Sequence, residues 1–289
     1  MTDIRLSEKR LSQERSYFVV KANDLITKTR YSLTTQQHRV LLYFISRIKP
    51  DDEPETVYEM RISDFADICG YNMDGGYYYE AIKRDIKTIT DTSCWIQVNA
   101  NGDEELFRWF DRVRMSKKNG TVRITFHSTV SEYLFHLVER TGYNSRSYYY
   151  MLGLKKYSSR LYEILCVLEY RHRGYVEMEI EELKRRVDAE SYTHMGHLKE
   201  RVIEPAIMEI NEYSDIIVDY DYKRTGRKIT HIIFNIREKQ NMEMAIQHRM
   251  LEGVINEEVR KERKEIRKRI EARREQIRME DLEEGINND

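Results

Sequence analysis

The chain has 289 residues, of which 40% are hydrophobic, enough for two modest domains with cores of their own. Three widely spaced cysteines indicate a reducing compartment without a disulfide framework. No apolar run approaches a membrane span and residues 1–15 are polar, so we expect a soluble cytoplasmic protein without membrane contact. Because the net charge is −1, nucleic-acid binding would have to rest on local clusters of charge.

The first half predicts a mixture of helices and strands. Residues 1–16 are charged without a clean period, and we interpret them as a mobile arm. Thr34 and Gln37 form a capping box at the start of the first clear helix. After it the periodicity predicts a strand at 57–62, a short helix ending at Gly70, a helix with Arg84 and Lys87 on its outer face, a hairpin of 93–98 with 106–115, a strand at 121–126 and an amphipathic helix at 128–138.

The second half repeats this order. It predicts a helix at 155–171, a strand at 175–180, a short helix at 181–187, a long helix at 191–214 and a hairpin that returns at 229–236. Apolar residues pair at an offset of 118 positions, namely Met60 with Met178, Ile62 with Ile180 and Phe65 with Leu183. The repeated order predicts an α+β protein of two tandem winged-helix domains, at 17–140 and 141–238, with a charged helical tail at 239–289.

The long helix and the hairpin after it carry the main functional signal. The helix has one apolar side, formed by Leu198, Val202, Ile203, Ala206, Ile207 and Ile210. The opposite side carries His194, His197, Arg201 and Glu204, and Pro205 should kink or break the helix. The tip of the hairpin has four cations and no anion: Lys223, Arg224, Arg227 and Lys228. Such a tip is usually just solvated, but beside a polar helix face it looks like a wing that grips phosphates while the helix reads bases.

Each candidate residue has a plainer alternative. Arg201 is the best candidate for a base contact, and its alternative is a pair with Glu204 or Glu200. Lys199 falls nominally on the inward side, from which it could extend to a phosphate or serve structure alone. Two basic groups of the first half could simply be solvated faces: Arg84 with Lys87, and a second cluster of Arg112, Arg114, Lys117 and Lys118. The tyrosine triplets at 77–79 and 148–150 favour packing over stacking on bases.

Enzymatic functions find little support. His194 and His197 lack the further partners that a metal site needs, so we expect neither metal nor cofactor. A rolling-circle nickase would need two histidines flanking one residue, and no pair has that spacing. No phosphate-binding loop of the Gly-x4-Gly-Lys-Ser/Thr kind occurs either, so we expect no catalytic activity. In the tail, charges of both signs alternate over 257–281, which favours a solvated helix over a stable coiled coil.

Several second-half motifs are similar to those of one known family: residues 158–163 (SSRLYE), 201–206 (RVIEPA), 209–211 (EIN), 226–228 (GRK) and 234–236 (FNI). Over about residues 17–238 the sequence resembles the replication initiator (Rep) proteins of theta-replicating plasmids. The resemblance implies two winged helices, the second making the main base contacts and the first adding phosphate contacts and dimerisation.

The resemblance also implies a function. Monomers would bind double-stranded DNA at repeated sites called iterons, open an AT-rich segment and recruit host replication proteins such as the helicase and the host initiator. Dimers, in equilibrium with monomers, would bind an inverted repeat and repress the protein's own gene. The protein would then be associated with plasmid DNA or the nucleoid of a bacterial cytoplasm. One alternative function also rests on sequence-specific DNA binding, namely a transcription repressor without initiator activity. The other is enzymatic, a DNA nickase, and the histidine spacing disfavours it.

The family's recognition helix corresponds here to His194, His197, Lys199 and Arg201, and its wing to Lys223, Arg224, Arg227 and Lys228. Glu200 departs from the family pattern because it interrupts a basic run. It could accept a hydrogen bond from a cytosine amino group, or it could lie on the helix surface without touching DNA.

Overall fold

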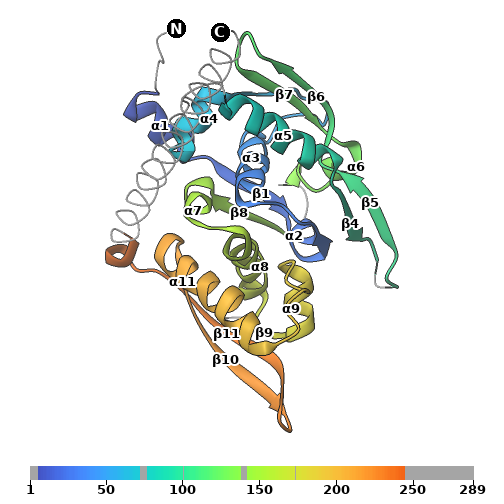
Figure 1. Cartoon of the computed structure of the whole chain (residues 1–289), viewed down its shortest axis with the longest axis vertical. Helices are drawn as coiled ribbons and strands as arrows, with labels where there is room; N and C mark the ends of the chain where they lie inside the picture. Colours follow the sequence, from blue (N-terminus) through green and yellow to red (C-terminus); the bar gives the residue numbers. More distant parts are fainter. Residues whose placement is uncertain (1–5, 72–76, 100, 138–141, 173, 245–289) are drawn as a thin grey trace, which may run out of the picture.

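A computed structural model describes residues 6–71, 77–99, 101–137, 142–172 and 174–244 (Figure 1). The predicted helical tail falls mostly on residues 245–289, which lie outside the described residues. The elements in chain order are α1 (Glu8–Arg15), β1 (Phe18–Ala22), α2 (Asn23–Lys28), β2 (Thr29–Arg30), α3 (Thr35–Ile45), β3 (Tyr58–Arg61), α4 (Ile62–Cys69), α5 (Tyr77–Asp91), β4 (Ser93–Gln97), β5 (Glu104–Arg108), β6 (Phe110–Ser116), β7 (Thr121–Phe126), α6 (Ser128–Ser131), β8 (Tyr143–Ser147), α7 (Tyr148–Gly153), α8 (Lys156–His172), β9 (Tyr175–Glu179), α9 (Ile180–Arg186), α10 (Met195–Leu198), the π-helical turn η2 (Lys199–Ile203), α11 (Glu204–Tyr213), β10 (Ile216–Thr225) and β11 (Lys228–Glu238).

Two units of the chain share one topology, which confirms the predicted pair of winged helices. In the first unit α3, β3, α4 and α5 precede the hairpin β6–β7, and the sheet order is β3-β7-β6. In the second unit α8, β9, α9 and the helix α10–η2–α11 precede the hairpin β10–β11, and the sheet order is β9-β11-β10. The offset of 118 positions also holds, since α4 begins at Ile62 and α9 at Ile180. Both residues are buried, as expected for matching core positions.

The first unit carries an insertion that the sequence pattern did not resolve. We expected one strand at 106–115, but the structure breaks it into β5 and β6, which belong to different sheets. The break lies at Trp109 and Phe110, which are both 1% exposed although they are adjacent. Adjacent buried side chains violate the two-residue alternation of a strand with one buried face, so the chain must bend there. The β4–β5 hairpin consequently joins β2 in a separate three-stranded sheet.

We predicted a mobile arm at residues 1–16, of which residues 1–5 lie outside the described residues and the remainder contacts the first unit. Residues 8–15 form α1, whose first turn is capped by the Ser7 hydroxyl. The buried Arg15 guanidinium donates to the carbonyl of Ile68 over 3.0 Å, and the backbone N–H of Leu6 donates to Asp67 over 2.8 Å. These are contacts with distant parts of the sequence, which explains why local periodicity gave no sign of them.

Two other helices are shorter than predicted. The amphipathic helix expected at 128–138 is confined to α6, and its end at Val138 lies outside the described residues. After α6 the chain continues in turns, and His136 takes a left-handed conformation with φ of 52° that no α-helix can contain. The long helix expected from 191 begins only at Met195, and its middle is the wide turn η2 directly before Pro205.

Candidate nucleic-acid interface

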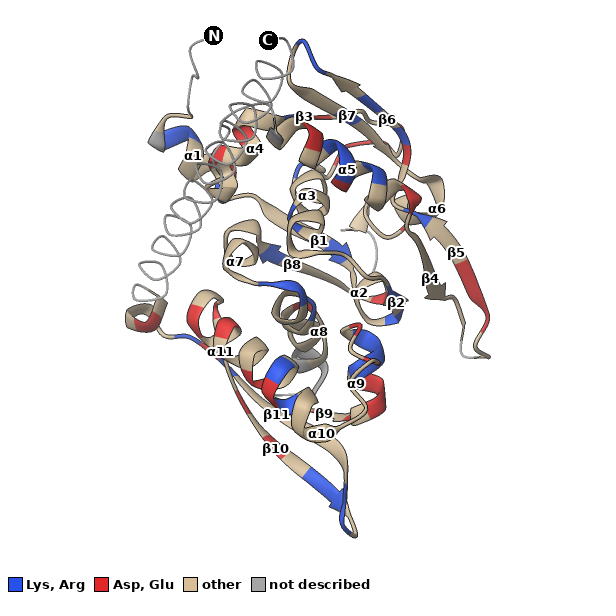
Figure 2. Ribbon diagram, in the orientation of Figure 1, with Lys and Arg blue, Asp and Glu red and all other residues tan. Residues whose placement is uncertain are grey.

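The β10–β11 hairpin projects from the second unit as the predicted wing. Strand β9 pairs with β11 only between His231 and Asn235, so the rest of the hairpin extends beyond the three-stranded sheet. Gly226, with φ of 62°, provides the left-handed residue of the turn. The four predicted cations Lys223, Arg224, Arg227 and Lys228 are all exposed on this projection. Figure 2 shows the resulting basic tip at one end of the molecule.

The four cations of the tip differ in how they are engaged. Lys223 Nζ lies 2.7 Å from Glu177 Oε1, and this hydrogen bond lowers the pKa of the Glu177 carboxyl. Lys223 must therefore exchange a partner to reach a phosphate. Within the described residues Arg224 and Arg227 form no ion pair. Together with Lys228 they line a hollow that reaches Thr193 and Met195 at the start of α10.

The helix α10–η2–α11, which we call the reading helix, presents the predicted polar face to solvent. All six residues of its predicted apolar side are buried: Leu198, Val202, Ile203, Ala206, Ile207 and Ile210. His194 is the N-cap residue, and its ring lies 5.7 Å from the ring of His197, centroid to centroid. His194, His197 and Arg201 are exposed. Nowhere in the described part of the chain do three or more His, Cys, Asp or Glu residues gather in a group that could hold a metal ion.

Lys199 is not on the inward side where the helical wheel placed it. Its side chain is 46% exposed, and its Nζ lies 3.4 Å from Glu204 Oε1. The hydroxyl of Tyr220 on β10 donates to the same carboxylate oxygen over 3.3 Å. Glu204 therefore connects the reading helix to the wing, a contact that sequence analysis missed because it depends on how strand and helix pack. Arg201, in contrast, has no ion pair among the described residues, so its alternative as half of an intrahelical pair is not realised.

The first unit carries a smaller version of the same surface. Arg84 and Lys87 are exposed on α5, as predicted, and Lys87 forms an ion pair with Asp91 one turn later. The second basic cluster, Arg112, Arg114, Lys117 and Lys118, is exposed on β6 and on the turn that leads to β7. Figure 1 shows the hairpins β6–β7 and β10–β11 pointing to opposite ends of the long axis. Both ends of the molecule therefore offer cations on a hairpin.

A buried charged cluster joins the two units. Lys21 on β1 forms an ion pair with Glu163 on α8, and both side chains are at most 4% exposed. Glu163 Oε2 also lies 3.7 Å from Arg160 and 4.0 Å from His38 on α3. Burial alone would raise the pKa of Glu163, but Lys21, His38 and Arg160 outweigh it and lower that pKa. Burial lowers the pKa of His38 to about 4, so this imidazole is neutral at neutral pH.

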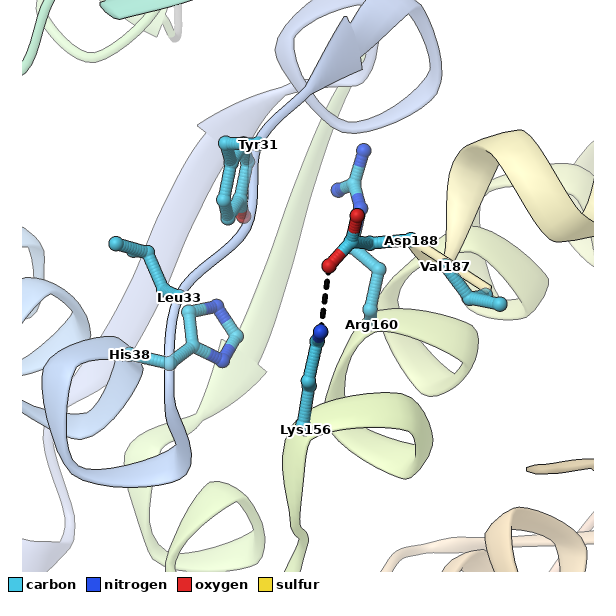
Figure 3. A pocket seen from close by; sticks show the side chains of 7 residues that line it. All are labelled: Tyr31, Leu33, His38, Lys156, Arg160, Val187 and Asp188. Carbon is cyan, nitrogen blue, oxygen red and sulfur yellow. Dashed lines mark hydrogen bonds and ion pairs between the residues drawn. The ribbon is translucent and has the colours of Figure 1, made fainter. Parts of the chain in front are cut away.

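Beside this cluster a small pocket opens between the units (Figure 3). Tyr31 and His38 line it from the first unit, and Arg160 lines it from the second. At its edge Lys156 and Asp188 form an ion pair, and the Ser32 hydroxyl donates to the same carboxylate over 2.6 Å. The tyrosine triplet at 148–150 contributes to the same junction, since Tyr148 and Tyr149 are buried and Tyr148 donates to the Arg39 carbonyl over 3.1 Å. These contacts hold the two winged helices together as predicted for the triplet.

Two family models and one solved structure agree with this architecture. The family model described as "Initiator Replication protein, WH1" matches residues 18–166, and the one described as "Initiator Rep protein, WH2" matches residues 179–236. Among solved structures, the Pi initiator protein in complex with iteron DNA has 18% identity and a TM-score of 0.64, with 78% of this chain and 99% of that chain covered. Domains 2 and 3 of RctB have 13% identity and a TM-score of 0.44, with 82% and 96% covered.

The similarity to the Pi structure shows the fold, and the two family models extend over more than half of the sequence. Within the described ranges no helix is long and apolar enough to cross a membrane. Because the two family models cover more than half of the sequence, the chain belongs to the family of initiator replication proteins. Its WH1 and WH2 parts follow each other in the order in which the two winged helices occur.

Proposed function

We propose that this protein starts plasmid replication by binding double-stranded DNA at iteron repeats, without a catalytic step of its own. The observation that carries the proposal is the exposed basic tip of the β10–β11 hairpin beside the exposed polar face of the reading helix. The solved Pi initiator, which shares the fold, is in complex with iteron DNA. In this proposal His194, His197, Lys199 and Arg201 face the bases.

The two units divide the work of binding. Arg224, Arg227 and Lys228 neutralise phosphates next to the groove that the reading helix enters, and Lys223 joins them once it leaves Glu177. Arg84 and Lys87 of the first unit add phosphate contacts that carry no sequence information. Bound at several repeats, the protein opens a neighbouring AT-rich segment, where deformation of the duplex costs least, and recruits host replication proteins.

We further propose that a dimer formed through the first unit represses the protein's own gene. An exposed row of side chains on the β2-β4-β5 sheet supports this. Trp95 on β4 and Leu106 on β5 stand opposite each other in the sheet, and they are 49% and 48% exposed. Arg30 on β2 extends the row beside Trp95. Exposed apolar side chains at a sheet edge are a typical surface for association.

The sequence of β5 favours pairing with a second copy of itself. β5 is the outer strand of its sheet. If two β5 strands pair antiparallel around Leu106, Glu104 of each copy faces Arg108 of the other, and the two leucines meet. Opposite charges at directly facing positions stabilise a strand pair, so the edge is complementary to itself. We therefore assign the dimer contact to this edge.

The DNA-binding proposal is tested by footprinting the purified protein on its plasmid's upstream DNA over a series of salt concentrations. We expect protection of evenly spaced direct repeats that weakens steeply as salt rises. Protection of one inverted repeat alone would favour the repressor without initiator activity. Absence of any sequence-dependent protection would refute the proposal.

The dimer proposal is tested separately by sedimentation of the protein and of its Leu106→Asp variant. We expect a concentration-dependent dimer for the unchanged chain and a monomer for the variant. Direct-repeat binding should be retained because β5, which carries Leu106, belongs to the first unit and lies apart from the reading helix (Figure 1). Val57→Asp, which introduces the same charge at an exposed apolar residue outside this sheet, is the control and should still dimerise. Equal dimerisation of all three proteins would rule out this surface.

A further inference from the structure

The reading helix contains one turn that is wider than an α-helical turn. In η2 the backbone N–H of Glu204 donates to the carbonyl of Lys199, five residues earlier, whereas an α-helix spans four. The next residue, Pro205, has no N–H to donate to the carbonyl of Arg201. In a regular α-helix its ring would also collide with that carbonyl. The wide turn avoids the collision and lets the helix continue through a proline.

The wide turn changes which side chains face solvent. On a regular helix, the buried side that contains Ala206 would extend back to Lys199, two turns earlier. In the structure Leu198 is 0% exposed instead, and Lys199 is exposed. One additional residue in the turn has therefore rotated the first half of the helix by about 100° relative to the second half. This rotation is why the helical wheel assigned Lys199 to the wrong side.

The rotated half is the part that carries the candidate base contacts, from His194 to Arg201. The ion pair of Lys199 with Glu204 also depends on the wide turn, because side chains five residues apart do not share a face of a regular α-helix. Glu204 in turn accepts the hydroxyl of Tyr220 on the wing. The turn thus fixes both the direction of the polar side chains and the contact between helix and wing.

We infer that Pro205 is a positioning residue for sequence recognition, because it imposes the wide turn that decides which side chains face the DNA. It contacts no base itself and acts through the orientation of His197, Lys199 and Arg201. This inference rests on the proposed function of the reading helix. A chain without Pro205 can form a straight helix, and such a helix would bury position 199 and move position 198 to the edge of the buried side.

Exchanging the two residues at these positions tests the inference without DNA. The variant Leu198→Lys with Lys199→Leu places a lysine in the core as long as the wide turn persists, so we expect a large drop in the midpoint of urea unfolding. Adding Pro205→Ala permits the straight helix, which buries the new leucine, and the midpoint should recover most of the loss. Adding Pro50→Ala, in an exposed loop, is the matched control and should recover nothing. No recovery with Pro205→Ala, or no initial loss, would overturn the inference.

Binding to DNA then tests the functional part. The single variant Pro205→Ala keeps every candidate base contact, and it should lose at least tenfold of the preference for the iteron over a scrambled duplex. Pro50→Ala is the matched control and should keep that preference. A fully retained preference would overturn the link between Pro205 and recognition. If the unchanged protein itself shows no preference, the proposed function fails, and the unfolding experiment still decides whether Pro205 sets the turn.

Discussion

The two winged helices of this chain share their strand order but differ at the surfaces that would meet DNA. In the first unit the hairpin strands β6 and β7 have 7 and 6 residues, and α5 is an uninterrupted helix of 15 residues. In the second unit β10 and β11 have 10 and 11 residues, and the reading helix is widened before Pro205. The second unit therefore has the longer wing and the more specialised helix.

This difference distinguishes the residues that form the winged-helix core in both units from the surfaces that differ between the two units. The buried pairs Ile62 and Ile180, and Phe65 and Leu183, stand 118 positions apart and fill matching places in the two cores. The surfaces instead diverge, since the first unit inserts β4 and β5 between α5 and β6, and these two strands form a separate sheet with β2. A duplicated core is thus compatible with one unit that reads DNA and another that holds phosphates and pairs with a second copy.

The largest expected effect comes from the cluster that joins the two units. Glu163→Leu removes the partner of Lys21 and leaves a buried ammonium unpaired, which should cost about 3–5 kcal/mol of unfolding free energy. Glu59→Leu within the first unit breaks the exposed ion pair with Arg123 and should cost at most about 1 kcal/mol. Urea unfolding of both variants measures the contrast. Similar losses at the two sites would contradict a special role for the junction.

Acid should loosen the same junction. The pKa of His38 is about 4 in the folded protein, whereas a histidine in the unfolded chain has the ordinary value of 6.5. As the pH falls, the unfolded chain therefore binds the proton first. Its contribution to stability is complete above pH 6.5 and is lost between there and about pH 4, amounting to about 3 kcal/mol. Glu163, whose pKa is also lowered, adds a loss in the same direction below its ordinary value of 4.5. Between pH 7 and 4.5 the free energy of unfolding should fall less steeply in a His38→Gln variant than in the unchanged protein. An equally steep fall in the variant would rule out His38 as the cause.

A smaller effect should distinguish the two recognition-type helices. If Arg201 contacts a base, Arg201→Ala should weaken iteron binding by about 1–3 kcal/mol and relax specificity at one position. Lys83 stands 118 positions earlier on the exposed side of α5, which makes Lys83→Ala the matched control. We expect that control to lower binding to iteron and scrambled duplexes alike. Competition binding with single-base iteron variants measures both, and a uniform loss from Arg201→Ala would assign Arg201 to a phosphate instead.

Much of this arrangement could be predicted from local patterns, while its junctions could not. The Thr34–Gln37 capping box and the apolar side of the reading helix depend on neighbours three or four residues apart, so the sequence displays them directly. Lys21 and Glu163 pair across 142 positions, and Arg15 contacts Ile68 across 53, so no periodicity reveals them. Lys199 was assigned to the wrong side because the wheel assumes a regular helix, although Pro205 marked the place where that assumption fails. The first wing was predicted on the wrong strands, because the pattern pairs 93–98 with 106–115 whereas β6 pairs with β7.

The smallest expected effect compares the two wings directly. Arg227→Ala at the tip of β10–β11 and Lys117→Ala at the tip of β6–β7 each remove one exposed cation. A cation that neutralises a phosphate releases a counterion on binding, so its loss should lower the slope of log affinity against log salt by about 0.9. We expect this change for Arg227→Ala on iteron and scrambled duplexes alike. For Lys117→Ala we expect it only if the first wing contacts the same duplex. A slope that changes with Lys117 but not with Arg227 would reverse the division of labour between the units, since the shorter wing would then be the one that holds DNA.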